Sequence, residues 1–123
     1  MSTFTVGAAL LDAMVLSVLE KEDTYGYQIT KDIQSQLDIS ESTLYPVLRR
    51  LQKDGNLSTY DRPYQGRNRR YYQITLLGKN HLVQYRKDWA EYKKQVDAFL
   101  GDNSADKKPQ NEDEGKRIIA DNT

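Results

Sequence analysis

The chain has 123 residues, of which 37% are hydrophobic and 29% are charged, and its mean hydropathy is −0.83. This length fits one domain, and the low hydropathy indicates charged surface helices or a disordered segment. The sequence contains no cysteine, which excludes disulfides and thiolate metal sites, and its one histidine, His81, does not by itself make a metal site. We therefore expect no metal and no cofactor.

The longest apolar stretch, residues 6–19, is broken by Gly7, Asp12 and Ser17. It is too short and too polar to cross a bilayer. Its charged residues follow the apolar stretch instead of preceding it, which argues against a signal peptide. We therefore expect a cytoplasmic protein with no membrane partner.

The chain has 18 basic and 18 acidic residues, and this balance argues at first sight against a nucleic-acid partner. The charges are not evenly spread, however. Residues 1–40 hold two cations against six carboxylates, whereas residues 41–75 hold seven cations against three. Six of these seven are arginines, whose planar guanidinium suits phosphates and guanine edges. An ordinary solvated basic face remains the alternative.

The first half of the chain predicts three short helices. Residues 5–21 are apolar around most of a helix circumference, so we expect this helix to be buried on two sides. Thr24 is suited to cap a second helix, 25–37, which has apolar residues at i, i+4 spacing.

The third predicted helix begins at a serine and ends at a glycine. Ser40 or Ser42 supplies the N-cap hydroxyl, and Gly55 takes the position just beyond the C-terminus. Pro46 falls several residues inside this helix, where it removes one backbone hydrogen bond and should bend the axis.

A β-hairpin and a long helix follow. Residues 56–60 and 69–75 are rich in leucine, threonine, tyrosine and isoleucine, and the turn-forming segment 61–68 separates them. Thr75 then caps a helix over residues 76–100. The polar remainder, 101–123, has no periodicity and is predicted to be a disordered tail.

The long helix carries an apolar seam in which the residues are spaced 3, 4, 3, 4, 3, as in a coiled coil: Leu82, Tyr85, Trp89, Tyr92, Val96 and Phe99. A domain of this size cannot cover the whole seam, so we expect it to form the interface of a homodimer. Packing of the seam on the first helix of the same chain is the alternative.

Three helices followed by a hairpin is the order of a winged helix-turn-helix. The expected fold is therefore mainly α with a small β-hairpin. Residues 1–75 form the predicted DNA-binding domain, and 76–100 form the C-terminal dimerisation helix. In such domains the third helix enters the major groove and the hairpin lies against a flanking groove.

The candidate DNA contacts come from three places. The start of the second helix offers candidate phosphate contacts, the third helix offers base-reading groups followed by backbone-binding cations, and the hairpin offers a basic loop. In that order they are Tyr25, Tyr27, Gln28 and Lys31; Glu41, Ser42, Thr43, Tyr45, Arg49, Arg50 and Lys53; and Tyr64, Gly66, Arg67, Arg69 and Arg70.

Four segments carry a resemblance to a known family: LDAMVLSVL at 11–19, YGYQI at 25–29, STLYPVLRRLQKDG at 42–55 and GRNRRYYQITLLG at 66–78. Together they resemble the PadR family of bacterial transcriptional regulators. The resemblance implies a homodimeric winged-helix repressor of a palindromic operator in double-stranded DNA, with the long helix making the dimer. It also makes Pro46 a family feature, whereas Gln52 departs from the glutamate of many members.

With a single C-terminal helix, the chain resembles the short subgroup of that family. Some members bind planar aromatic compounds between the protomers, beside a tryptophan of the long helix. Trp89 has the matching place, and the candidate effector-binding residues are Trp89, Tyr85, Tyr92, Lys93, Ala13 and Leu16. Trp89 as a large interface residue without a ligand is the alternative.

The sequence is compared with two other classes of function because a winged helix does not by itself imply DNA binding. A winged helix that binds a partner protein, without sequence-specific DNA binding, is the first alternative. An enzyme is disfavoured, because the sequence has no glycine-rich phosphate loop and His81 lies next to the predicted dimer seam.

Overall fold

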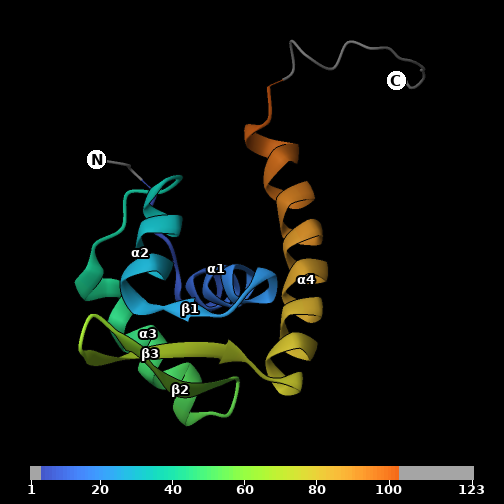
Figure 1. Cartoon of the computed structure of the whole chain (residues 1–123). Helices are drawn as coiled ribbons and strands as arrows, with labels where there is room; N and C mark the ends of the chain where they lie inside the picture. The colour runs from blue at the N-terminus through green and yellow to red at the C-terminus, as the bar shows by residue number, and fades with distance from the viewer. Residues whose placement is uncertain (1–3, 103–123) are drawn as a thin grey trace, which may run out of the picture. The chain divides into compact units, whose positions relative to one another are not determined.

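The computed structural model describes residues 4–102. In chain order the elements are α1 (Ala8–Lys21), β1 (Thr24–Tyr25), α2 (Gly26–Gln34), α3 (Glu41–Lys53), β2 (Leu57–Tyr64), β3 (Arg67–Ile74) and α4 (Leu76–Leu100), as Figure 1 shows. This order confirms the predicted fold class, mainly α with a small hairpin. The predicted disordered tail lies outside the described residues apart from its first two. Within residues 4–102, no helix combines the length and apolarity needed to cross a membrane.

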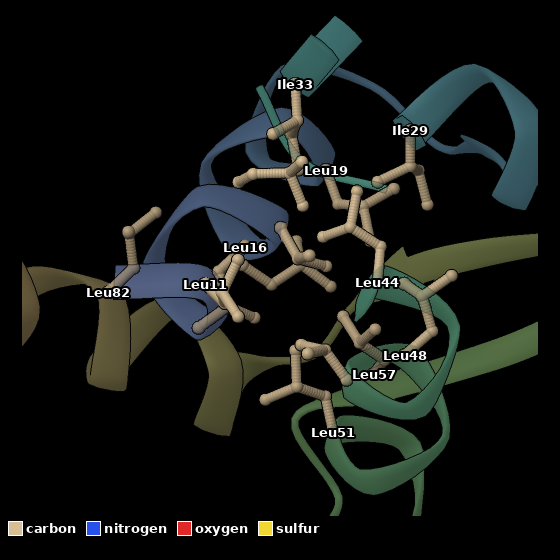
Figure 2. Close-up of a cluster of buried hydrophobic side chains, with 14 residues drawn as sticks. Leu11, Leu16, Leu19, Ile29, Ile33, Leu44, Leu48, Leu51, Leu57 and Leu82 are labelled. Atoms are coloured by element: carbon tan, nitrogen blue, oxygen red, sulfur yellow. The ribbon is translucent and has the colours of Figure 1, made fainter. Parts of the chain in front are cut away.

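One hydrophobic core joins all three short helices, the hairpin and the first turns of α4. Its members recur at helical or strand spacing: Leu11, Val15, Leu16, Leu19, Ile29, Ile33, Ile39, Leu44, Val47, Leu48, Leu51, Leu57, Ile74 and Leu82 (Figure 2). Complete burial of one such side chain stabilises a fold by about 1.5–3 kcal/mol. The core therefore fixes α3 and the root of the hairpin as parts of one scaffold.

Both ends of α3 have the predicted local structure. The Ser40 hydroxyl accepts a hydrogen bond from the Thr43 N–H at 3.2 Å, which satisfies one of the free donors of the first turn. At the other end Gly55 has φ +84°, and the Asn56 N–H bonds to the Leu51 carbonyl at 2.9 Å. This is a Schellman motif, which requires the left-handed conformation that glycine adopts without strain.

Three helix boundaries differ from those predicted. α1 begins at Ala8 instead of residue 5. Thr24 does not cap α2; it lies in β1, because its backbone pairs with β3, a partner far along the chain. α2 ends at Gln34 instead of residue 37, and the chain adds a turn in which the Leu37 N–H reaches the Ile33 carbonyl at 3.0 Å.

The segment 61–68, predicted as a loop, is mostly strand. β2 and β3 pair along their whole length and are joined by a turn of only two residues, Gln65 with φ +51° and Gly66 with φ +81°. Positive φ at both positions gives the turn the twist of the flanking strands. Pro63 is tolerated because the sheet order is β1-β3-β2, which leaves β2 at an edge.

The start of α4 packs closely on the turn that follows α3. As predicted, Thr75 caps the helix, since its hydroxyl accepts the Gly78 N–H at 3.1 Å. The same hydroxyl donates to the Gly55 carbonyl at 2.7 Å. A Cβ added at Gly78 would lie 2.4 Å from the Asn56 carbonyl oxygen, so only glycine allows this approach. The described residues divide into two compact units within α4, one ending at Asp88 and the other beginning at Trp89.

Replacing Gly78 with Ala should therefore destabilise the protein by about 2 kcal/mol, because the new methyl group overlaps a backbone carbonyl. Alanine otherwise favours a helix over glycine by about 1 kcal/mol, so the overlap decides the sign of the change. Urea unfolding followed by circular dichroism measures the difference in free energy of unfolding. Gly7→Ala is the control, because a Cβ there meets nothing within 4 Å. A Gly78→Ala protein more stable than the wild type would contradict the close packing.

Candidate nucleic-acid interface

The first turns of α3 present an exposed polar face. Leu44, Val47 and Leu48 point into the core, which leaves Glu41, Ser42 and Thr43 exposed on the opposite side. The hydroxyls are held together, since the Ser40 oxygen lies 3.0 Å from that of Ser42 and 2.9 Å from that of Thr43. Donors and acceptors of this kind, at a helix N-terminus, suit hydrogen bonding to base edges and phosphates.

Pro46 is the sixth residue of α3 and is exposed. It has no N–H, so the Ser42 carbonyl lacks its helical donor. The helix nevertheless continues to Lys53, because Val47, Leu48 and Leu51 are all buried in the core. Burial of the later turns thus outweighs the lost backbone bond.

A groove rich in tyrosine lies between the start of α2, α3 and the β2–β3 hairpin, which we call the wing. It has a volume of about 550 Å³ and is lined by Tyr25, Gly26, Tyr27, Tyr45, Tyr64, Arg69, Arg70 and Tyr72. Gly26 lets α2 approach α3, since a Cβ there would lie 3.1 Å from the Tyr45 ring. This tyrosine groove brings together side chains from all three predicted sources of DNA contacts.

Arg69 is enclosed by the aromatic rings of the groove. Its guanidinium carbon lies 3.6 Å from the centroid of the Tyr25 ring and 3.7 Å from that of Tyr64. One of its terminal nitrogens donates to the Tyr71 hydroxyl at 2.8 Å. Such cation–π stacking is attractive and directional. Arg69 therefore holds the tip of the wing against the start of α2, which corrects its expected role as an arginine free to enter a DNA groove.

Aromatic stacking also stiffens the root of the wing. The Tyr71 ring stacks on Tyr60 with centroids 5.7 Å apart, and Arg62 lies 4.7 Å over the centroid of Tyr71. The Tyr60 hydroxyl donates to Asp23 at 2.7 Å, and this hydrogen bond raises the pKa of Tyr60. Tyr71 is thus a strand-packing residue.

Arg50, predicted to bind the DNA backbone, has another partner. Both of its terminal nitrogens bond to the carboxylate of Asp12 in α1. The other exposed cations of α3 are Arg49 and Lys53. Arg50 is thus an interhelical contact, and the DNA-backbone role predicted for it stays a prediction.

The remaining candidates lie at the surface. Arg67 and Arg70 are exposed on the wing, and Gly66 has open space around it. Tyr27 is 52% exposed, with the Lys31 ammonium 5.6 Å from its ring centroid. The Gln28 side chain donates to Asp32 at 2.8 Å, within α2.

Sequence reasoning missed two residues that the structure brings to this region. Tyr72 lines the tyrosine groove from β3, and Asp12 binds Arg50. A charged residue inside an otherwise apolar helix was a visible signal for Asp12, because a buried carboxylate requires a partner. No local signal marked Tyr72.

The residues predicted for the dimer seam and the effector divide into exposed and buried sets. Trp89, Tyr92 and Phe99 are 45%, 57% and 88% exposed, and the Trp89 and Tyr92 rings lie 6.3 Å apart. Leu82 is 2% exposed and Leu16 is completely buried, so both belong to the core of the protomer. This corrects Leu82 as a seam residue and Leu16 as a pocket wall. Of the others, Lys93 is exposed, and Ala13, Tyr85 and Val96 are half-buried.

Comparison with known proteins agrees with this geometry. The Transcriptional regulator PadR-like family matches residues 15–84. The solved structure of the Streptococcus mutans protein smu.1704 is 42% identical with a TM-score of 0.73, and the match covers 80% of this chain and 93% of that one. A PadR family transcription regulator from Clostridium difficile is 33% identical with a TM-score of 0.68, over 74% of this chain and 98% of that one. The Mycobacterium tuberculosis transcriptional regulator Rv3488 is 33% identical, and the match covers 60% of this chain and 70% of that regulator.

The stacking of Arg69 predicts that Arg69→Ala loosens the wing in the free protein, whereas Arg67→Ala, at an exposed position, does not. Amide hydrogen exchange of residues in β2 and β3 near the turn should become at least about threefold faster in Arg69→Ala, because three cation–π contacts and one hydrogen bond are lost. The Arg67→Ala protein is the matched control. Equal exchange rates in the two variants would show that the tyrosines hold the wing without Arg69.

Proposed function

The chain belongs to the PadR-like family of transcriptional regulators, and we propose that it acts as a homodimeric repressor that binds a palindromic site in double-stranded DNA. The observation that carries the proposal is the tyrosine groove, around which the exposed face of α3, the start of α2 and the wing converge. In a winged helix these are the three elements that face DNA.

The three elements have different roles in this proposal. Ser42 and Thr43 read base edges in the major groove, because their hydroxyls donate and accept hydrogen bonds at the exposed start of α3. Arg67 and Arg70 extend from the wing into an adjacent groove, where a narrow minor groove attracts arginine. Tyr27 and Lys31 contact phosphates, which sets the register of the protein on the duplex.

The second half of α4 supports a dimer. Trp89, Tyr92 and Phe99 expose large aromatic surfaces along one helix, at the spacing of a coiled-coil seam. Exposed apolar surface of this extent is uncommon in monomers, and a second copy of the chain supplies a matching face. A two-fold dimer places two copies of α3 one helical turn of DNA apart, so its site is an inverted repeat.

The same surface suits a planar aromatic effector. The Trp89 and Tyr92 rings are tilted by 47° and close enough to offer stacking faces. In the dimer a second pair of rings comes from the partner, and a ligand between the pairs relieves repression by changing how the two DNA-binding domains are held. Lys93, exposed on the same stretch of α4, completes the proposed pocket.

Selection from a random duplex library by the purified protein should recover an inverted repeat, and affinity should fall steeply with salt. Arg67→Ala and Arg70→Ala should weaken binding to all sequences and reduce the salt slope by about 1 each. Thr43→Ala should instead change the preferred base at one position of each half-site and leave the salt slope unchanged. A protein that enriches no sequence, yet co-purifies with a stoichiometric partner protein, would overturn the DNA assignment.

Trp89 is the only tryptophan, so its fluorescence reports on the proposed effector site. Titration with a planar three-ring compound such as acridine should quench this fluorescence saturably and weaken binding to the selected duplex. Quenching of free N-acetyltryptophanamide by the same compound is the control for collisional effects. If a broad panel of planar compounds gives no saturable quenching, Trp89 is an interface residue alone.

A further inference from the structure

Asp12 places a carboxylate within the apolar side of α1. Its neighbours Leu11, Val15 and Leu16 belong to the core, and Asp12 itself is only 6% exposed. A carboxylate removed from water is tolerated only when other groups satisfy its charge and its lone pairs. The partners of Asp12 therefore show what this position does.

The partners come from two other helices. Arg50 of α3 binds both carboxylate oxygens, with one nitrogen 3.1 Å from Oδ2, and Asp12 raises the pKa of Arg50. The Tyr85 hydroxyl of α4 donates to Oδ2 at 3.3 Å. Desolvation and the nearby Asp12 charge raise the pKa of Tyr85. A tyrosine hydroxyl, with an ordinary pKa of about 10, is protonated at neutral pH and can donate this bond.

Through these contacts Asp12 links α3, the proposed base-reading helix, to α4, the helix that carries the aromatic seam. Arg50 lies seven residues, or about two turns, beyond Thr43 on the same helix. Tyr85 lies four residues, or about one turn, before Trp89. One buried carboxylate therefore holds the helix that reads bases and the helix that carries the exposed aromatic seam.

We propose that Asp12 is a positioning residue for DNA recognition: through Arg50 it sets the orientation of α3 against α1, and through the Tyr85 hydroxyl it makes that orientation depend on α4. The inference rests on the proposed DNA binding. It follows that a ligand or partner protomer that moves the Tyr85 hydroxyl away from Asp12 changes how α3 meets the bases, without touching α3.

The chain provides a matched control for this link. Arg86 of α4 also binds α1, through Glu20, with nitrogen to oxygen distances of 2.9 and 3.2 Å. Glu20 and Arg86 are largely exposed, and neither contact involves α3. Removing this pair weakens the attachment of α4 to α1 and leaves the hold on α3 intact.

The test compares Tyr85→Phe with Glu20→Gln in the full chain. For each variant the affinity ratio is measured between the duplex selected by the wild-type protein and a scrambled duplex of equal length. Tyr85→Phe should lower this ratio by about fivefold, a modest value for coupling between sites. Glu20→Gln should leave it unchanged. A hydroxyl that served only stability would lower the melting temperature and leave the ratio unaltered.

An Arg50→Gln background completes the experiment. If the hydroxyl acts through Asp12 and Arg50, adding Tyr85→Phe to Arg50→Gln lowers the affinity ratio no further. If the two residues act independently, the two losses in the ratio add. The proposal is overturned by an unchanged ratio in Tyr85→Phe, by an equal loss in Glu20→Gln, or by additive losses. The comparison of Tyr85→Phe with Glu20→Gln decides even where Arg50→Gln fails to fold. A wild-type protein that shows no preference for any duplex overturns the proposed function itself, and the inference with it.

Discussion

The burial of α1 on more than one side is the constraint on which the rest of the structure depends. Val15 and Leu16 are adjacent in the sequence and both are completely buried, although successive residues of a helix point about 100° apart. One neighbour cannot cover two such directions, so more than one element must pack around this helix. α2, α3 and β3 do so, and the start of α4 adds Leu82 to the same core. The positions of α3 and of the start of α4 follow from that requirement, as does the need to give Asp12 partners within the same packed interior.

Aromatic and cationic groups stack across the edges of the tyrosine groove. Arg69 joins Tyr25, before α2, to Tyr64 at the tip of the wing, and Gly26 allows α2 to come close to Tyr45 of α3. A wing of two strands alone is marginally stable in water. In the proposed function the stacking therefore serves DNA binding indirectly, because it holds the wing, with its exposed arginines, against the start of α2.

Although the net charge of the chain is zero, its cations differ in whether they have partners within the protein. The acidic first third supplies partners for two arginines, Asp12 for Arg50 and Glu20 for Arg86. Arg69 is held by tyrosines, whereas Arg49, Lys53, Arg67 and Arg70 are exposed and make no ion pair within residues 4–102. A surface with few free cations attracts DNA only moderately in general, so affinity depends on contacts that fit a particular site.

The sequence alone determined the structural features that depend only on residues close together in the chain. The caps at Ser40 and Thr75, the glycine end of α3 and the helical spacing of the core were all predictable, because each rests on hydrogen bonds or periodicity within a few residues. The tertiary structure alone decided the rest. Thr24 became a strand because β3 pairs with it, and the hairpin lengthened because its two strands stay paired up to a two-residue turn. Arg50 and Arg69 read as DNA contacts in the sequence, but a carboxylate 38 residues away and rings from two other segments hold them. Attraction between charges and rings acts through space, so only the folded chain shows which cations have partners.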